Sequence, residues 1–555
     1  MKDFVMLKNL IMKTNKLEIS ILICILLVAL FLRVSGSHFG YPLLTHADEK
    51  AILQPVLHMT EKMTLDPNMY NRPDHIMIYI NFFTLNIISF LKFGLFISST
   101  FHDNEFFFYH VARIITALFG VACVFITFLI GKQFKKDFGL IAALVFAIFS
   151  SFVEHSNYVT PDVPITLFSL LIIYFSIKFL KTDRKIYLIL STLFCAVNTA
   201  EKYPGLISLI IVSTVIIIKI WPLIRKDLSC GLKELVKTHI HYGLIYLLFL
   251  FLVAPNIFIE YGQVLAAIKR ESRSYHLGVE NLGWFGNMLF YAKTYFNISG
   301  AILFISLIIG IIMFIKNKEL FMLPLFYGFA YWFLLSKIPL HWERWALPMY
   351  ITPLLISSYG IRYVYDYLIS IKNKSKINLM VFYLLLFFSG ITMLLECSIG
   401  IMRNSFQDTR VISLEYCNNN GISKDNSISE GYTPFIPNEL VNLKFDYNMV
   451  TSRSYIILSS YIYRRYYNEN ERYNDQVQLY ERIKKENKLI VSFKPWSYTK
   501  KLKENPVLGS MGIHLEYDRF IKSINFFNAL ITHQNYPPLT GPQIDIYQVE
   551  SSASS

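Results

Sequence analysis

Two adjacent carboxylates stand shortly after the first long apolar run of the chain. Asp48 and Glu49 end the segment Tyr41–Glu49, and the apolar run before it begins at Ile19. One interpretation is a helix cap, because acidic side chains at a helix N-terminus accept backbone hydrogen bonds and favour the helix dipole. The alternative is a general base at a membrane surface, with a neighbour that tunes or orients it.

A third carboxylate stands at another boundary of an apolar run. Asp162 lies in the segment Asn157–Pro164, directly after Pro161. Proline suits the first turn of a helix and aspartate favours the dipole there, so capping accounts for the pattern. A second acidic residue close to Asp48 would equally suit the positioning of a substrate.

Two basic residues are candidates for binding a phosphate. Lys202 stands in Thr199–Gly205 near the end of an apolar run, where a lysine commonly extends to lipid headgroups. It lies on the side with few basic residues, which favours phosphate binding. Arg344 stands in Lys337–Pro348, and a guanidinium binds phosphate through two hydrogen bonds. The alternative for Arg344 is an ion pair with Glu343 or with another acidic residue.

Neighbours of these residues are further candidates for substrate contacts. They are Tyr203, Glu343, His46 and His341. The two histidines are also explained as hydrogen-bonded side chains at the membrane interface. The loop 259–297 is interpreted either as a lid over the site or as a structural connection, and it contains Arg270, Arg273, His276 and Trp284.

The composition indicates that membrane helices position these residues. Of 555 residues, 54% are hydrophobic and 17% are charged, whereas a soluble protein carries about a quarter charged residues. The formal net charge is +14. In a membrane chain this basic excess is typical of cytoplasmic loops, so we predict no binding of nucleic acid. The six cysteines have no Cys-x-x-Cys spacing, which argues against a zinc site or a disulfide framework.

Eleven apolar runs approach the length of about 20 residues that a membrane span requires. The first is interpreted as a membrane helix rather than a cleaved signal peptide, because no small-residue cleavage site follows it. A further stretch, 76–98, contains Asn81 and Asn86 and is predicted to be an interfacial or re-entrant helix. The predicted spans are 18–36, 107–131, 138–156, 161–181, 186–201, 204–222, 241–258, 298–315, 319–336, 345–366 and 377–400.

Basic clusters set the predicted orientation. Lysine and arginine accumulate on the cytoplasmic side of membrane proteins, and six basic clusters all fall inside if 76–98 does not span the bilayer. The N-terminus is then cytoplasmic, and the outer loop 37–106 and everything after residue 400 are not. We therefore expect chemistry on the non-cytoplasmic face.

The last part of the chain has the periodicity of a soluble domain. We predict a membrane domain over 1–400 and an extracytoplasmic α/β domain over 401–555. Its predicted helix is Gln476–Lys488, and its predicted strands are Met449–Thr451, Tyr455–Leu458, Leu489–Phe493 and Ile544–Val549.

Taken in order, these motifs resemble those of a known superfamily. The order is Asp48-Glu49, Arg113–Gly120, Thr160–Pro164, Glu201–Leu206 and Glu343–Pro348. It resembles the GT-C glycosyltransferases, in the branch that includes protein O-mannosyltransferases and bacterial lipid A aminoarabinose transferases. The resemblance extends more loosely into the tail, at Asp408–Arg410 and Gly541–Tyr547.

The resemblance implies a polytopic membrane enzyme whose donor is a sugar on a polyprenyl phosphate. It implies that Asp48 is the general base, that Glu49 orients the base or the acceptor, and that Asp162 positions a substrate. Lys202 and Arg344 would hold the lipid phosphate. Direct displacement at the anomeric carbon would invert its configuration. No metal is required for this chemistry, although an Asp-Glu pair can hold a divalent ion.

Other functions remain as alternatives on the sequence. A secondary transporter or flippase of lipid-linked precursors would place its charges near the membrane midplane, whereas here they gather at outer ends. An envelope assembly protein and a polysaccharide polymerase with a diphosphate-linked donor are further alternatives. The acceptor is left open between lipid A, a cell-surface polysaccharide and a protein hydroxyl. The outer domain and the lack of an endoplasmic-reticulum retention signal favour a bacterial plasma membrane.

Overall fold

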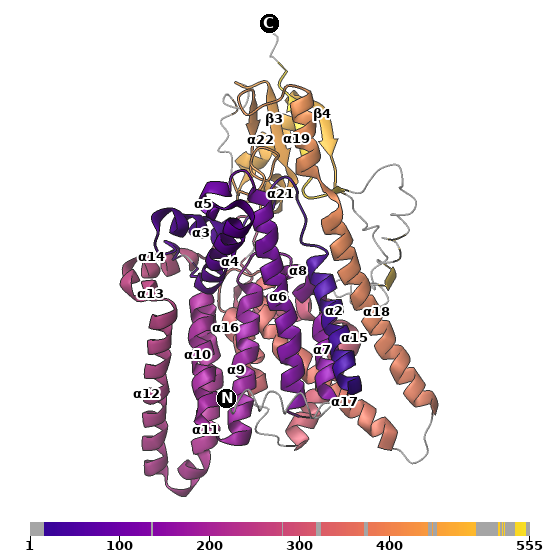
Figure 1. Ribbon diagram of the computed structural model, residues 1–555. Helices are drawn as coiled ribbons and strands as arrows, with labels where there is room; N and C mark the ends of the chain where they lie inside the picture. The colour runs from indigo at the N-terminus through magenta and orange to yellow at the C-terminus, as the bar shows by residue number, and fades with distance from the viewer. Residues whose placement is uncertain are drawn as a thin grey trace.

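A computed structural model gives the fold of the chain (Figure 1). It describes residues 16–70, 72–134, 137–279, 281–317, 324–370, 376–441, 447, 452–495, 520, 521, 524, 527 and 539–550. Long helices form a bundle, and a region containing strands, coloured orange to yellow, covers one end of it. This arrangement confirms the predicted polytopic helical protein with a C-terminal α/β region.

In the first half of the chain, α2, α6, α9 and α10 follow the predicted runs closely. Eight helices in the described residues have the length and composition to cross a membrane, by those criteria alone. The elements of this half are α2 (Lys16–Val34), α3 (Lys50–Lys62), α4 (His75–Phe93), α5 (Ile97–Thr100), α6 (Glu105–Lys132), α7 (Phe138–Ile148), α8 (Ser150–His155), α9 (Asp162–Thr182), α10 (Lys185–Glu201), η1 (Tyr203–Ser208) and α11 (Leu209–Lys226).

The second half contains longer and more irregular helices. One predicted span, 298–315, belongs to a helix that starts at Gly283 and is kinked at Gly300, where φ is 76°. The elements are α12 (Leu228–Val253), α13 (Asn256–Ile259), α14 (Tyr261–Glu271), α15 (Gly283–Asn317), α16 (Tyr327–Leu335), η3 (Glu343–Ala346), α17 (Leu347–Ser370) and α18 (Lys376–Ser405). The last helix continues past the predicted domain boundary at residue 400.

The helix α4 lies at the end of the bundle, beside α3 and α5, close to the C-terminal region (Figure 1). Its length and composition would suffice for a span. The interfacial or re-entrant position of this helix stays a prediction. Asn81, buried inside it, donates a hydrogen bond to the Met77 carbonyl at 2.8 Å.

The prediction of one continuous helix over 138–156 is wrong. Phe149 has extended backbone angles, φ −72° and ψ 112°, and separates α7 from α8. A break inside the bundle frees carbonyl groups that need donors. Arg33 of α2, which is 1% exposed, supplies them: its guanidinium donates to the Phe146 carbonyl at 3.1 Å and to the Ala147 carbonyl at 3.0 Å. A buried arginine therefore makes the break possible.

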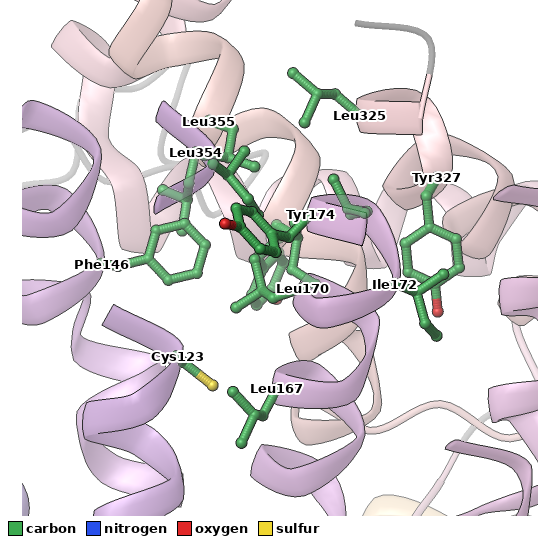
Figure 2. Close-up of a cluster of buried hydrophobic side chains, with 14 of the residues drawn as sticks. Cys123, Phe146, Leu167, Leu170, Ile172, Tyr174, Leu325, Tyr327, Leu354 and Leu355 are labelled. Carbon is green, nitrogen blue, oxygen red and sulfur yellow. The ribbon is translucent and has the colours of Figure 1, made fainter. Parts of the chain in front are cut away.

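Apolar side chains from α6, α7, α9, α16 and α17 fill the centre of the bundle. Figure 2 shows Cys123, Phe146, Leu170 and Leu354 among them. The helix α9 is buried over most of its length, whereas α12 and α18 expose most of theirs. Exposed apolar faces of this extent suit contact with lipid. The interior of the bundle is thus packed, and polar groups gather at its ends.

The C-terminal domain contains a four-stranded sheet with the order β2-β3-β6-β4. The β2–β3 pair is parallel and the other two pairs are antiparallel. The predicted helix and three predicted strands are present, while Met449–Thr451 lies outside the described residues. The elements are β1 (Gln407–Asp408), α19 (Thr409–Asn419), β2 (Ser427–Ser429), β3 (Tyr455–Ser459), α21 (Ser460–Asn468), α22 (Asn474–Glu486), β4 (Lys488–Phe493), β5 (Leu539–Thr540) and β6 (Ile544–Gln548).

Candidate active site

A cavity of about 760 Å³ lies between the end of the bundle and the C-terminal domain. We call it the Asp48 cavity. It collects side chains from segments that are far apart in the sequence, including the loop before α3, the junction of α10 and η1, η3, and α21. Its charged lining residues are Asp48, Arg72, Lys202, Glu271, Arg273, Lys337, Arg344 and Arg465.

Both carboxylate oxygens of Asp48 meet arginines. Arg344 of η3 donates from Nη1 to Oδ2, and Nη1 of Arg72 lies 3.4 Å from Oδ1. The side chain of Asp48 stays 29% exposed. Burial alone would raise the pKa of the Asp48 carboxyl, but Arg344 and Arg72 outweigh that effect and hold it below its usual range. Asp48 is therefore an ionised carboxylate at neutral pH.

The short connection between α3 and α4 adds an ion pair that the sequence analysis missed. Nε of Arg72 lies 2.6 Å from Oδ2 of Asp74, which is fully buried. Burial raises the pKa of Asp74 to about 7, although Arg72 and Lys202 act against it. The Asp74 amide donates to the Glu201 carbonyl at 2.9 Å, so this connection is tied to the segment that carries Lys202.

Lys202 and Asp162 form a further ion pair of the site. Their side chains approach within 2.6 Å, with exposures of 13% and 3%. Lys202 lines the Asp48 cavity, whereas Asp162 is not one of its lining residues. Tyr203 also lines the cavity and donates its hydroxyl to the Tyr70 carbonyl at 2.9 Å. The structure thus brings four predicted residues, including Asp48 and Arg344, to one cavity, and gives Asp162 the position of a residue that holds Lys202.

Glu49 points away from the cavity. Its side chain is buried against Arg113, which donates to the two carboxylate oxygens at 2.8 and 2.7 Å. The Val159 amide donates to the same carboxylate at 3.1 Å. Arg113 also donates to the carbonyls of Ser37 and Phe39, both at 3.0 Å. Glu49 is therefore placed to fix the backbone next to Asp48, and it makes no contact with the cavity.

The C-terminal domain also holds the segment before Asp48. Arg410 is bound to Asp408 through two hydrogen bonds of 2.8 and 2.7 Å, and it donates to the Thr45 carbonyl at 3.1 Å. Gly541 packs on this pair: its φ is +95°, and a Cβ there would lie 2.7 Å from Oδ1 of Asp408. The two tail segments that resemble the superfamily thus meet beside the site.

The remaining predicted residues lie elsewhere. His46 stacks on Tyr158 with ring centroids 4.4 Å apart. It lines a second cavity of about 750 Å³, which we call the His46 cavity. His341 packs on Phe290, with centroids 4.3 Å apart, and lines a third cavity together with Glu343. None of these three residues lines the Asp48 cavity.

A ready-made metal site is not formed by the described residues. No group of three or more histidine, cysteine, aspartate or glutamate side chains gathers among them. The Asp48 oxygens face Arg344 and Arg72, and the Glu49 oxygens face Arg113. The adjacent carboxylates therefore do not converge as a pair of metal ligands, and the predicted independence from a metal stays a prediction.

Comparisons with known proteins agree with the sequence motifs. Residues 96–259 match the family model of dolichyl-phosphate-mannose-protein mannosyltransferases. This segment runs from α5 to α13 and includes Asp162 and Lys202. No curated protein sequence shows a significant match to the chain.

Solved structures share the fold at low sequence identity. The apo form of the Archaeoglobus fulgidus oligosaccharyltransferase is similar with a TM-score of 0.52 and 12% identity, over 86% of this chain and 73% of that one. Its complex with Zn and sulfate gives 0.51 and 11%, over 95% and 88%. ArnT from Cupriavidus metallidurans in the apo state reaches 0.44 and 11%, over 73% and 72%. The matched family segment and the fold shared with the oligosaccharyltransferase confirm that the chain resembles the GT-C glycosyltransferases, as its motifs predicted.

Proposed function

We propose that the chain is a membrane glycosyltransferase that moves a sugar from a polyprenyl phosphate to an acceptor hydroxyl. The reaction takes place on the non-cytoplasmic face, in a bacterial plasma membrane. The observation that carries this proposal is the Asp48 cavity, where an ionised carboxylate contacts Arg344 and Arg72, and Lys202 lines the same cavity at the end of an apolar bundle. The transferred sugar is a hexose or a pentose, and the acceptor is a glycan, a lipid or a protein.

The polyprenyl chain and the phosphate of the donor would bind to different regions of the protein. The polyprenyl chain belongs in the hydrocarbon layer, beside the exposed apolar helices. The phosphate belongs at the end of the bundle, where Arg344 offers a two-pronged donor and Lys202 a point charge. Lys202 also lies 5.7 Å from the centre of the Trp345 ring, which limits its positions.

The ion pair between Arg344 and Asp48 suggests how donor binding prepares the base. Without donor, the two side chains neutralise each other. A phosphate bound by Arg344 replaces the carboxylate as its partner and adds a negative charge nearby. Both changes raise the pKa of Asp48 toward its usual range, which makes the carboxylate a stronger base. Arg72 keeps the carboxylate in place meanwhile.

The transfer step is then a single displacement. Asp48 accepts the proton of the acceptor hydroxyl while the acceptor oxygen forms a bond to the anomeric carbon. The bond from that carbon to the phosphate oxygen breaks, and its electron pair stays with the polyprenyl phosphate. Arg344 and Lys202 stabilise the charge that develops on this leaving group. Attack from the opposite side inverts the anomeric configuration.

Transport is the less favoured function. A flippase needs a polar route through the bundle, whereas the centre of the bundle is filled by apolar side chains (Figure 2). The charged groups of the site gather at one end.

A reconstituted assay tests the proposal. Purified protein in liposomes is given a panel of radiolabelled polyprenyl-phosphate monosaccharides, and donor consumption is followed. We expect one donor to be consumed by the wild-type protein and not by Asp48→Asn. Asp103→Asn, an exposed carboxylate of the outer loop, serves as the control and should retain activity. Consumption of no donor by well-folded protein would count against the function.

A further inference from the structure

The Asp48 cavity carries more positive charge than one lipid phosphate requires. Three of its basic residues have carboxylate partners within ion-pair distance: Arg72, Lys202 and Arg344. Within the described part of the chain, no carboxylate lies at such a distance from the other three, which are Arg273, Lys337 and Arg465. A phosphodiester donor brings a single negative charge. The lining also contains the carboxylate of Glu271. Together with Asp48, Asp74 and Asp162 it gives four carboxylates, which with the donor phosphate leave one of the six positive charges for a second anionic group.

Arg465 is the residue of this set that belongs to the C-terminal domain. It lies on α21, and its guanidinium carbon is 5.9 Å from the centre of the Tyr432 ring, which also lines the cavity. The aliphatic part of its side chain packs on Gly278, where φ is +81° and a Cβ would lie 2.8 Å from Cγ of Arg465. Only glycine lets the loop approach so closely.

The loop that contains Arg273 is fastened to the same domain. Leu277 is 7% exposed and belongs to the core around Ile462 and Tyr466. Glu469 accepts a hydrogen bond from the Gly278 amide at 2.5 Å and another from the Tyr275 hydroxyl at 2.7 Å. These contacts hold residues 275–278 against the domain, and the exposed Arg273 stands two positions before them at the cavity.

His276 lies close enough to Arg273 and Arg465 for their charges to affect its pKa. Its ring meets Trp342 edge to face, with centroids 5.4 Å apart. Burial lowers the pKa of His276, and Arg465 and Arg273 lower it further, against the opposing effects of a hydrogen bond with the Leu277 backbone and of Glu469. The two guanidinium groups thus act on one imidazole. They lie on segments outside the spanning helices, namely the loop after α14 and the helix α21 of the C-terminal domain.

We propose that Arg465, together with Arg273, forms a second anion subsite that binds a negatively charged group of the acceptor, such as a phosphate monoester. This inference rests on the proposed function. The acceptor is the fitting partner because Arg465 is supplied by the soluble domain, whereas the donor phosphate is held at the membrane helices by Arg344 and Lys202. The C-terminal domain then contributes to acceptor selection directly.

Adjacent arginines on α21 give a matched test. Arg465 lines the Asp48 cavity, whereas Arg464 is exposed and lines the His46 cavity. Arg465→Gln and Arg464→Gln are compared in phosphatidylcholine liposomes containing the donor. The acceptor probe is a lipid-anchored disaccharide that carries a phosphate monoester, and the same molecule after phosphatase treatment. Because a charge-assisted contact is lost, we expect Arg465→Gln to raise the KM for the phosphorylated probe about tenfold or more.

In Arg465→Gln the donor KM and the KM for the dephosphorylated probe should stay at their wild-type values. In Arg464→Gln the donor KM and the KM for the phosphorylated probe should both stay at their wild-type values. A change in the donor KM instead would assign the subsite to a second charge on the donor and overturn the inference. Equal use of both probes, insensitive to Arg465→Gln, would overturn it as well. If the wild-type protein transfers no sugar, the proposed function fails, and binding of the phosphorylated probe, followed by tryptophan fluorescence, still decides the subsite by its dependence on Arg465.

Discussion

Two adjacent carboxylates, one facing the Asp48 cavity and one buried, each form an ion pair with an arginine, but the two pairs have different roles. Asp48 and Glu49 are neighbours, and each is bound by an arginine that is distant in the sequence. Asp48 faces the cavity at 29% exposure with Arg344 at 24%. Glu49 and Arg113 are shut off from solvent at 1% and 0%.

This difference in exposure decides what each ion pair can do. A partly exposed pair separates at small cost, because water and an incoming phosphate replace the lost partner. A buried pair cannot separate without leaving an uncompensated charge. The pair at the cavity is therefore suited to exchange partners during a reaction, and the buried pair to hold the backbone that presents Asp48.

The largest expected effect is on activity, at the cavity face. Asp48→Asn should lower kcat by about 10²–10⁴-fold, because a general base contributes that much. The melting temperature should change little, since the asparagine keeps the shape of the side chain at a partly exposed position. Single-turnover transfer and thermal unfolding in the same detergent measure both quantities. A variant that retains its kcat would show that another group accepts the proton.

The next effect is on stability, on the buried side. Glu49→Gln leaves Arg113 charged and buried without its partner, which should cost about 3–5 kcal/mol of folding free energy. Thermal and denaturant unfolding measure this loss. Glu61→Gln, at an exposed position of α3, is the control and should stay within about 0.5 kcal/mol of wild type. Comparable stability of the two variants would contradict the distinction between the pairs.

Much of this arrangement could be predicted from the sequence. Asp48, Lys202 and Arg344 are predicted site residues because charged residues at the ends of apolar runs are unusual, and Tyr203 is a neighbour of Lys202. All four line one cavity. The helices α2, α6, α9 and α10 begin and end close to the predicted runs because hydrophobicity and length determine them locally. The apolar residues of β3, β4 and β6 predicted those three strands, whereas β2, a three-residue strand with two serines, was not predicted.

The partners of these residues could not be predicted, because they depend on packing between distant segments. The local sequence does not show that Glu49 is buried and Asp48 is not, because the burial of Glu49 depends on its contact with the distant Arg113. The break at Phe149 depends on Arg33 reaching across from another helix. Arg465 stands in an arginine pair on an amphipathic helix, and the docking of the C-terminal domain decides which arginine enters the cavity. Arg72 and Asp74 flank a proline before an apolar run, a pattern like that around Asp162 that could have been noticed.

A smaller effect should follow from removing the cation at the cavity face. Arg344→Gln takes a charge-assisted contact from the donor phosphate, so the donor KM should rise about tenfold to a hundredfold. Arg344 lowers the pKa of Asp48, so without it that pKa rises. The acidic limb of kcat/KM should therefore move to higher pH, because the carboxylate is protonated earlier as the pH falls.

The shift in pH dependence separates this role from a merely structural one. Arg270→Gln, on the exposed part of α14, is the matched control and should alter neither the donor KM nor the pH profile. A donor KM that rises while the acidic limb stays in place would mean that Arg344 binds the donor without tuning Asp48.

The smallest effect is expected for an ion pair that is more exposed than either of the two compared above. Arg403 of α18 lies 3.4 Å from Glu154 of α8, and the two side chains are 45% and 44% exposed. Solvent already surrounds both charges, so their coupling should be less than about 1 kcal/mol. A double-mutant cycle with Arg403→Gln and Glu154→Gln, read by thermal unfolding, measures the coupling. If exposure governs these pairs, the coupling should also weaken with added salt; a value near that of Glu49 and Arg113 would show that geometry matters more than access to water.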